Sequence, residues 1–348
     1  MRVTCQKCKK QYDIPDSRLP QGKKIAFPCR ECQALVEIDL TPHVEKTKDA
    51  SPSDSAARSK SDPPAKEKKQ LAGDALKKVV LSKIHKLPAM PEVVVKALQI
   101  VRQPDASFKA ISDILATDQA ITIGVLKTAN SAYYGQTGKI ASVHGAAIVL
   151  GLQSLVDLIS IVGTAKLLKV HLKGYGLNAD YLWKHSLAAG LAAKILARKQ
   201  ESVNEHDAFT AGLIHDVGKI VLDPYVAERM DGFVAYRKTH QGAFYQAEKR
   251  LLGLDHGEIA SDLFRVWNIP QEIRQGVKFH HDPAKFNKPM AHIVHAANLI
   301  AKRTAIEPEQ TFRTMGEERD SFTWLQINEP EIALIVEEVE NAVTEIMT

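Results

Sequence analysis

From Asp74 almost to the end of the chain, apolar residues recur at the spacing of helices that each bury one face. The clearest runs cover residues 93–101, 111–115, 121–126, 146–150, 155–168, 183–197 and 332–346. Asn328 precedes the last run as a candidate cap. Prolines fall between the runs, where helices are expected to begin or end. They are Pro88, Pro91, Pro104, Pro224, Pro270, Pro283 and Pro289.

This pattern predicts a helical domain over residues 74–305, with a C-terminal helical extension, residues 306–348, packed on it. Residues 1–40 differ, because they hold all the cysteines and short β-prone segments. Residues 41–73 are rich in Ser, Pro, Lys and Asp and almost free of large apolar groups. Such a segment cannot bury enough surface to offset its ordering entropy, so we expect a disordered linker.

Composition and charge restrict the candidate functions. Of the 348 residues only 6% are aromatic, and aliphatic residues dominate, which favours helix-on-helix packing. The net charge of +5 is entirely N-terminal: residues 1–73 hold 15 Lys/Arg and 10 Asp/Glu, whereas residues 74–348 hold 31 of each. A neutral main domain argues against sequence-independent nucleic-acid binding. The sequence shows no secretory signal and no apolar run of membrane-spanning length, so we expect a cytoplasmic protein that does not enter membranes.

All four cysteines stand in two matched pairs, Cys5/Cys8 and Cys29/Cys32. Two such turns together supply four thiolates in the tetrahedral arrangement that zinc prefers. The alternatives are redox-active pairs and free core cysteines, and use of every cysteine in a matched pair disfavours both. A site with four thiolates has no open position, so we expect it to be structural. The segment resembles the short zinc-ribbon module of bacterial regulatory proteins.

A second constellation surrounds residues 212–219, where adjacent His215 and Asp216 interrupt an apolar helical pattern and Lys219 follows. Burying both polar groups needs a compensating partner. The pair is either hydrogen-bonded near a helix end or part of a metal site. Further histidines occur at intervals along the chain, at positions 185, 256, 280, 281 and 295. Helix-borne His and Asp side chains can together build a metal site inside a helical domain.

A histidine followed by an adjacent His-Asp pair, on separate predicted helices, resembles the signature of the HD superfamily of metal-dependent phosphohydrolases, which ends in a further Asp. The resemblance implies that His185 is the first ligand, that His215 and Asp216 are the central pair, and that Lys219 approaches a substrate phosphate. It also implies a second-metal set made of His256, His280 and His281. Where the closing Asp is expected, the chain has Asn298, a weaker, neutral ligand, with His295 one turn before it. A site of this composition admits iron, manganese, zinc or nickel.

Residues 87–91, 114–121, 126–135 and 140–151 identify the branch. These motifs, in this order, resemble the HDOD family, the HD-related output domain of bacterial signalling proteins, over about residues 75–305. The resemblance implies an all-α HD-superfamily helical domain, here preceded by a small β-rich zinc ribbon. Within it, Asn130 and Ser131 either cap a helix end or face a ligand.

The resulting functional prediction is a bacterial signal-transduction output protein that binds a protein partner or a small ligand such as a nucleotide. The alternative is a phosphohydrolase acting on a nucleotide or phosphodiester, with Lys219 and Asp216 as catalytic residues. A third hypothesis is nucleic-acid binding through the zinc ribbon, which the neutral main domain disfavours. The partner, the ligand and the oligomeric state do not follow from the sequence.

Overall fold

The computed structural model describes residues 2–4, 8, 10–13, 24–28, 35–39, 72–82, 90–135, 139–240, 243–305 and 319–348. Backbone contacts divide the chain into two compact units, Met1–Glu67 and Lys68–Thr348. In the first unit, β1 (Arg2–Thr4) pairs antiparallel with β2 (Gln11–Asp13), and β3 (Lys24–Pro28) pairs antiparallel with β4 (Leu35–Asp39). Of the four cysteines only Cys8 is described, and it is exposed. The predicted ligands Cys5, Cys29 and Cys32, and nearly all of the predicted linker, lie outside the described residues.

The second unit is helical, as the apolar spacing predicted. Its first part contains α1 (Gly73–Ser82), α2 (Glu92–Ile100), α3 (Phe108–Leu115), α4 (Gln119–Ala129), η3 (Ala132–Tyr134), α5 (Val143–Leu150) and α6 (Leu152–Leu168). The middle part contains α7 (Ala179–Ala197), α8 (Glu205–Ile214), α9 (Gly218–Ala227), α10 (Met230–Thr239), α11 (Phe244–Leu252) and α12 (His256–Val266). The last part contains α13 (Gln271–Lys278), η4 (Pro283–Lys285), α14 (Pro289–Arg303), α15 (Arg319–Trp324) and α16 (Glu329–Met347).

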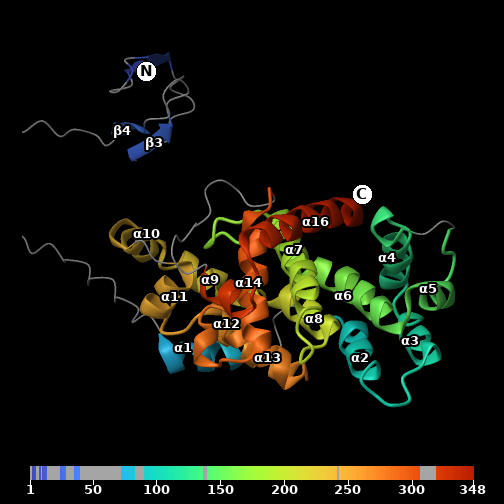
Figure 1. The fold of residues 1–348 in the computed structure, drawn as a ribbon. Helices are drawn as coiled ribbons and strands as arrows, with labels where there is room; N and C mark the ends of the chain where they lie inside the picture. The colour runs from blue at the N-terminus through green and yellow to red at the C-terminus, as the bar shows by residue number, and fades with distance from the viewer. Residues whose placement is uncertain are drawn as a thin grey trace, which may run out of the picture. The chain divides into compact units, whose positions relative to one another are not determined.

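Helix α7 forms the centre of this unit and is buried on most of its surface. It packs against α6, α8, α14 and α16. Figure 1 shows α2–α5 at one end of the unit and α9–α12 at the other, with α6, α7, α8 and α14 between them. The close approach of α8 to α7 requires Gly212, since a Cβ there would lie 2.4 Å from the carbonyl oxygen of Ala189. This contact brings the end of α8 against the middle of α7.

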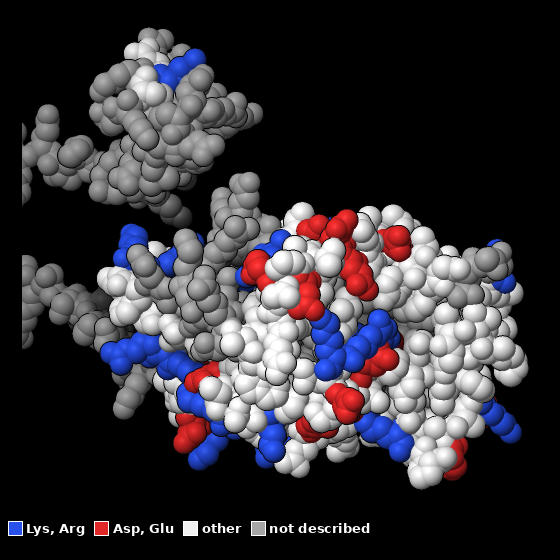
Figure 2. Space-filling model, viewed as in Figure 1, with Lys and Arg blue, Asp and Glu red and all other residues white. Residues whose placement is uncertain are grey.

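Helix α16 confirms the predicted final helix and its cap. The Asn328 side chain accepts a hydrogen bond from the backbone N–H of Glu331, whose carboxylate accepts one from the backbone of Asn328. The helix packs on α7 and α14. On the face shown in Figure 2, acidic side chains gather over α16, and basic side chains elsewhere are interspersed with acidic ones. No helix among the described residues is long and apolar enough to cross a membrane.

One expectation about a helix end needs correction, one is confirmed, and the role of Asn130 is resolved. Pro224 lies inside α9 and not between helices, because the rest of that helix buries an apolar face that outweighs one lost backbone hydrogen bond. The predicted helical stretches 146–150 and 155–168 form α5 and α6, which separate at Gly151 with φ of 81°. Asn130 caps α4, donating to the carbonyl oxygen of Ile140 and accepting from its N–H, so it faces the backbone and not a ligand.

Candidate metal centre

Six helices, α7, α8, α9, α12, α13 and α14, bring the predicted site residues together. His185 projects from the middle of α7, and His215 and Asp216 occupy the turn between α8 and α9. His256 is the first residue of α12, where Asp255 caps the helix with a capping box. His280 and His281 follow the end of α13, and Asn298 lies on α14. All of these side chains are buried except that of His281, which is partly exposed.

Asp216 is at the centre of the cluster. Its Oδ1 lies 3.1 Å from His256 Nε2, and its Oδ2 accepts a hydrogen bond from Lys219 Nζ at 2.6 Å. The same Oδ2 lies 3.4 Å from His215 Nε2 and 3.7 Å from His185 Nε2. The turn is held close to α12 because Gly218 has no side chain: a Cβ there would lie 1.9 Å from the carbonyl oxygen of His256. A single carboxylate thus faces three imidazoles and one ammonium group.

Two histidines are oriented as metal ligands usually are. His215 Nδ1 donates to the carbonyl oxygen of Gly212 at 2.7 Å, and His280 Nδ1 donates to that of Val277 at 2.6 Å. These bonds assign the proton to Nδ1 and leave a lone pair on Nε2. Both Nε2 atoms are buried and make no hydrogen bond to any described residue. A buried acceptor without a partner is costly, and a metal ion would satisfy both.

The donors fall into two adjoining groups. His185, His215 and Asp216 form one and His256, His280 and His281 form the other, and within each group the candidate ligand atoms lie within 4.8 Å of one another. His256 Nε2 faces both Asp216 Oδ1 and, at 2.8 Å, His281 Nε2. Imidazole and carboxylate donors in this arrangement suit divalent transition metals.

Burial and neighbouring charges set the protonation of these groups. Burial lowers the pKa of four of the imidazoles, which favours the neutral, metal-binding form; these are His185, His215, His280 and His281. Burial disfavours the charged form of Asp216 too, but His215 and Lys219 outweigh it and hold the pKa of that carboxyl well below its usual value. His256 is the exception: burial is outweighed by Glu248 and Asp216, which raise its pKa to about 9. In the metal-free protein, His256 Nε2 therefore carries a proton and directs it at Asp216 Oδ1.

Asn298 and His295 both lie at the cluster. Asn298 Oδ1 is 3.2 Å from His185 Nε2, so the residue that replaces the expected Asp occupies the site itself. His295 Nδ1 donates to the carbonyl oxygen of His280 at 2.7 Å and so supports the turn that presents His280. Both are buried. The structure thus brings every sequence-predicted His, Asp, Lys and Asn of this site into one place.

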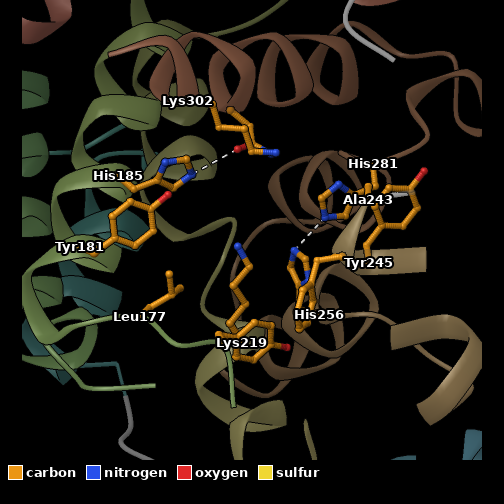
Figure 3. A pocket seen from close by; sticks show the side chains of 12 residues that line it. Leu177, Tyr181, His185, Lys219, Ala243, Tyr245, His256, His281 and Lys302 are labelled. Atoms are coloured by element: carbon orange, nitrogen blue, oxygen red, sulfur yellow. Dashed lines mark hydrogen bonds between the residues drawn. The ribbon is translucent and has the colours of Figure 1, made fainter. Parts of the chain in front are cut away.

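A pocket opens beside the cluster and contains residues that the sequence analysis missed. It has a volume of about 80 Å³. In Figure 3, His185 and Tyr181 line one side, and His256, His281 and Tyr245 line the other, with Lys219 between them. Lys302, one turn after Asn298, adds a second ammonium group to the lining.

Glu248 and Tyr175 were also missed. Glu248 is fully buried on α11 and holds His256, and Tyr175 donates to it from the loop between α6 and α7. That loop is closed by a β-bridge between Leu172 and Leu177, and the N–H of Gly174 donates to Asp223 on α9 at 2.7 Å. The sequence held a signal for Glu248 that the analysis did not use, because this glutamate lies four residues after Phe244 and four before Leu252, which is the spacing of one helix face.

Comparison with known families gives two matches. The HDOD domain matches residues 87–283, more than half of the chain, and a zinc-ribbon domain matches residues 1–36. An uncharacterized protein of Treponema pallidum is 23% identical over 228 residues, which is 64% of this chain. The match covers 44% of that relative's length, so the two proteins share less than half of the longer chain.

Solved structures match the helical unit. An HDOD domain protein of unknown function from Geobacter sulfurreducens is 27% identical, with a TM-score of 0.63 over 78% of this chain and 94% of the other. A candidate phosphohydrolase from Shewanella amazonensis is 23% identical, with a TM-score of 0.60 over 77% of this chain and 96% of the other. At that identity the second likeness shows the fold alone.

Proposed function

The chain belongs to the HDOD domain family, and from that premise we propose that its helical unit is a signalling output module that works with a metal ion bound in the His/Asp cluster. The observation that carries the proposal is the pair of buried Nε2 atoms of His215 and His280, which have no hydrogen-bond partner among the described residues. Their Nδ1 atoms are already fixed on carbonyl oxygens, so a metal ion is the partner that this geometry favours.

The ions would be held by His185, His215 and Asp216, and by His256, His280 and His281. Iron, manganese, zinc and nickel all accept such donors. The output would arise when a protein partner or a small ligand binds at the pocket. Lys219 and Lys302 give that pocket two ammonium groups, which favour an anionic group such as phosphate. The pocket therefore has room for at least one such group together with water.

A second candidate function is hydrolysis of a nucleotide or phosphodiester. It is favoured by the adjoining groups of donors and by Lys219, which would offset charge developing on phosphorus. A divalent ion in the cluster would polarise a phosphoryl oxygen. Asn298 weighs against hydrolysis, since a neutral amide at this position leaves the bound ions with less charge compensation than a carboxylate would. We therefore place ligand-dependent output first and hydrolysis second.

For the N-terminal unit we propose a structural zinc site of Cys5, Cys8, Cys29 and Cys32, which would make this unit a zinc ribbon. The match of residues 1–36 to a zinc-ribbon domain supports it. Loss of zinc from the double variant Cys5→Ser/Cys8→Ser is the expected result. A double variant that contains as much zinc per chain as the wild type would contradict the assignment.

The same double variant tests the main proposal, because metal that it retains reports on the helical unit. Elemental mass spectrometry of the full chain is expected to find one or two equivalents of metal in the double variant. Addition of Asp216→Asn is expected to remove most of that metal. A double variant that takes up no metal, even when incubated with manganese or zinc and dialysed, would refute the proposal. Turnover of phosphodiesters by the loaded protein, lost in Asp216→Asn, would move hydrolysis to first place.

A further inference from the structure

Glu248 is the buried carboxylate next to the cluster. Its Oε2 accepts hydrogen bonds from His256 Nδ1 at 2.7 Å and from the backbone N–H of His256 at 2.8 Å. Its Oε1 accepts from the hydroxyl of Tyr175 at 2.7 Å. The side chain is fully buried beside apolar neighbours on α11, where an uncompensated carboxylate would be costly. These three bonds explain how the charge is tolerated and fix where the carboxylate points.

The bond to Nδ1 determines which nitrogen of His256 is available. With Nδ1 donating to Glu248, the remaining nitrogen is Nε2, and Nε2 faces Asp216 and His281. His215 and His280 reach the same orientation with a neutral carbonyl oxygen as acceptor. Of these three imidazoles, His256 alone is held by a carboxylate, which makes its Nε2 a stronger donor to a metal.

We propose that Glu248, held in turn by Tyr175, is a positioning residue that orients His256 and strengthens it as a metal ligand. The inference rests on the proposed function, since it assumes that the cluster binds a metal ion. It assigns a role to a residue outside the HD-type ligand set, on a helix that carries none of the ligands. It also places part of the control of the site in the loop between α6 and α7, which carries Tyr175.

A purely structural role for Glu248 would be to support the start of α12, because it also accepts from the backbone of His256. That start already has its own support, however: Asp255 accepts from the N–H of Glu258, and the Glu258 carboxylate accepts from the N–H of Asp255. Glu258 is therefore a matched control. It is a glutamate at the same helix start, and its carboxylate bonds the backbone N–H of Asp255, whereas that of Glu248 bonds His256.

The variant to compare is Glu248→Gln. Its amide oxygen can still accept from the backbone and Nδ1 of His256, and its NH₂ group can donate to the Tyr175 oxygen, so the change removes the charge and keeps the shape. Tyr175→Phe removes only the hydroxyl. Mn²⁺ binding to the full-length variants is followed by the loss of the free-ion paramagnetic resonance signal, since manganese prefers imidazole and carboxylate to a four-thiolate site. Unfolding midpoints of the metal-free proteins are measured alongside.

We expect Glu248→Gln to weaken Mn²⁺ binding by about tenfold to a hundredfold. Tyr175→Phe is expected to have a smaller effect in the same direction, and Glu258→Gln to stay within about twofold of the wild type. Equal affinities for wild type and Glu248→Gln would overturn the inference and leave the proposed function intact. An equal loss in Glu258→Gln would also overturn it, because the effect would then belong to the helix start. If the Cys5→Ser/Cys8→Ser protein bound no Mn²⁺ and no other divalent ion, the proposed function and this inference would both fail.

Discussion

Replacing Asn298 with aspartate is expected to have opposite effects on the metal-free and the metal-loaded protein. Asn298 is 5% exposed, and its Oδ1 lies 3.2 Å from His185 Nε2. Asp216 Oδ2 lies 3.7 Å from the same nitrogen. The substitution keeps the shape of the side chain and adds one negative charge to a cluster whose donor set contains a single carboxylate.

The magnitude follows from these distances. Since both oxygens lie close to His185 Nε2, they are no more than about 7 Å apart, where two carboxylates repel by about 2 kcal/mol at an effective dielectric constant near 20. The metal-free protein should lose roughly that much stability. With a divalent ion about 4 Å from the new carboxylate, the attraction is about 8 kcal/mol before hydration is subtracted. Most of it offsets lost hydration, so we expect a gain in metal affinity of at least about tenfold, or about 1.4 kcal/mol.

The assay pairs calorimetric titration with Mn²⁺ and urea unfolding of chelator-treated protein. Asn328→Asp is the matched control, because it makes the same chemical change at an exposed helix cap, where Asn and Asp serve equally well. The control is expected to change neither quantity by more than about 0.5 kcal/mol. Metal affinity that stayed constant or fell in Asn298→Asp would refute the reasoning, because Asn298 would then not face the bound ion.

Three further predictions follow from the site. Gly218→Ala is expected to lower the free energy of unfolding in urea by about 1–3 kcal/mol and to impair metal binding, because the new Cβ would meet the carbonyl oxygen of His256. Gly232→Ala on α10 is the control and should not destabilise the protein, since its new Cβ would lie 3.6 Å from the nearest atom. The metal-free protein should be most stable near pH 6.5. The pKa of His256, raised to about 9, adds up to about 3 kcal/mol to the free energy of unfolding at pH values below the unfolded pKa near 6.5, and this contribution is lost as the pH rises to 9. The lowered pKa values of the other imidazoles reduce the free energy of unfolding below pH 6.5. Urea unfolding that showed stability rising from pH 6.5 to 9 would contradict this. Lys219→Met should leave Mn²⁺ affinity equal or higher, since Lys219 competes for Asp216, and should weaken binding of inorganic phosphate to the loaded protein at least tenfold by calorimetry; unchanged phosphate binding would remove Lys219 from the pocket's function.

The helical fold was predictable because its signal is local. Apolar residues three and four apart mark each buried face, and Asn328 with Glu331 marks a helix start. Pro224 shows the limit of such signals: a proline inside a helix is tolerated when tertiary packing compensates for one lost bond, and packing is not visible in local sequence.

The His/Asp cluster was predictable only through the family likeness, since spacing along the chain does not show that His185 on α7 and His280 after α13 meet in space. Tyr175, Glu248 and Lys302 were missed for a different reason. Tyr175 reaches the site from a loop, Glu248 acts on the side of His256 that faces away from the cluster, and Lys302 resembles any basic residue in a last helical turn. Their roles depend on tertiary contacts, and no pattern of residue types encodes those contacts.

The loop between α6 and α7 is tied to α9 through Gly174 and Asp223 and to the cluster through Tyr175. If metal binding by His256 depends on Glu248, any event that displaces this loop changes the affinity for the ion. Thermodynamic linkage makes this effect reciprocal: a bound ion must weaken, by the same factor, the binding of any partner that displaces the loop. The metal ion and a partner that binds by moving the loop would therefore each weaken the binding of the other. The fraction of protein bound to the partner would then report the metal supply of the cell, without any catalysis.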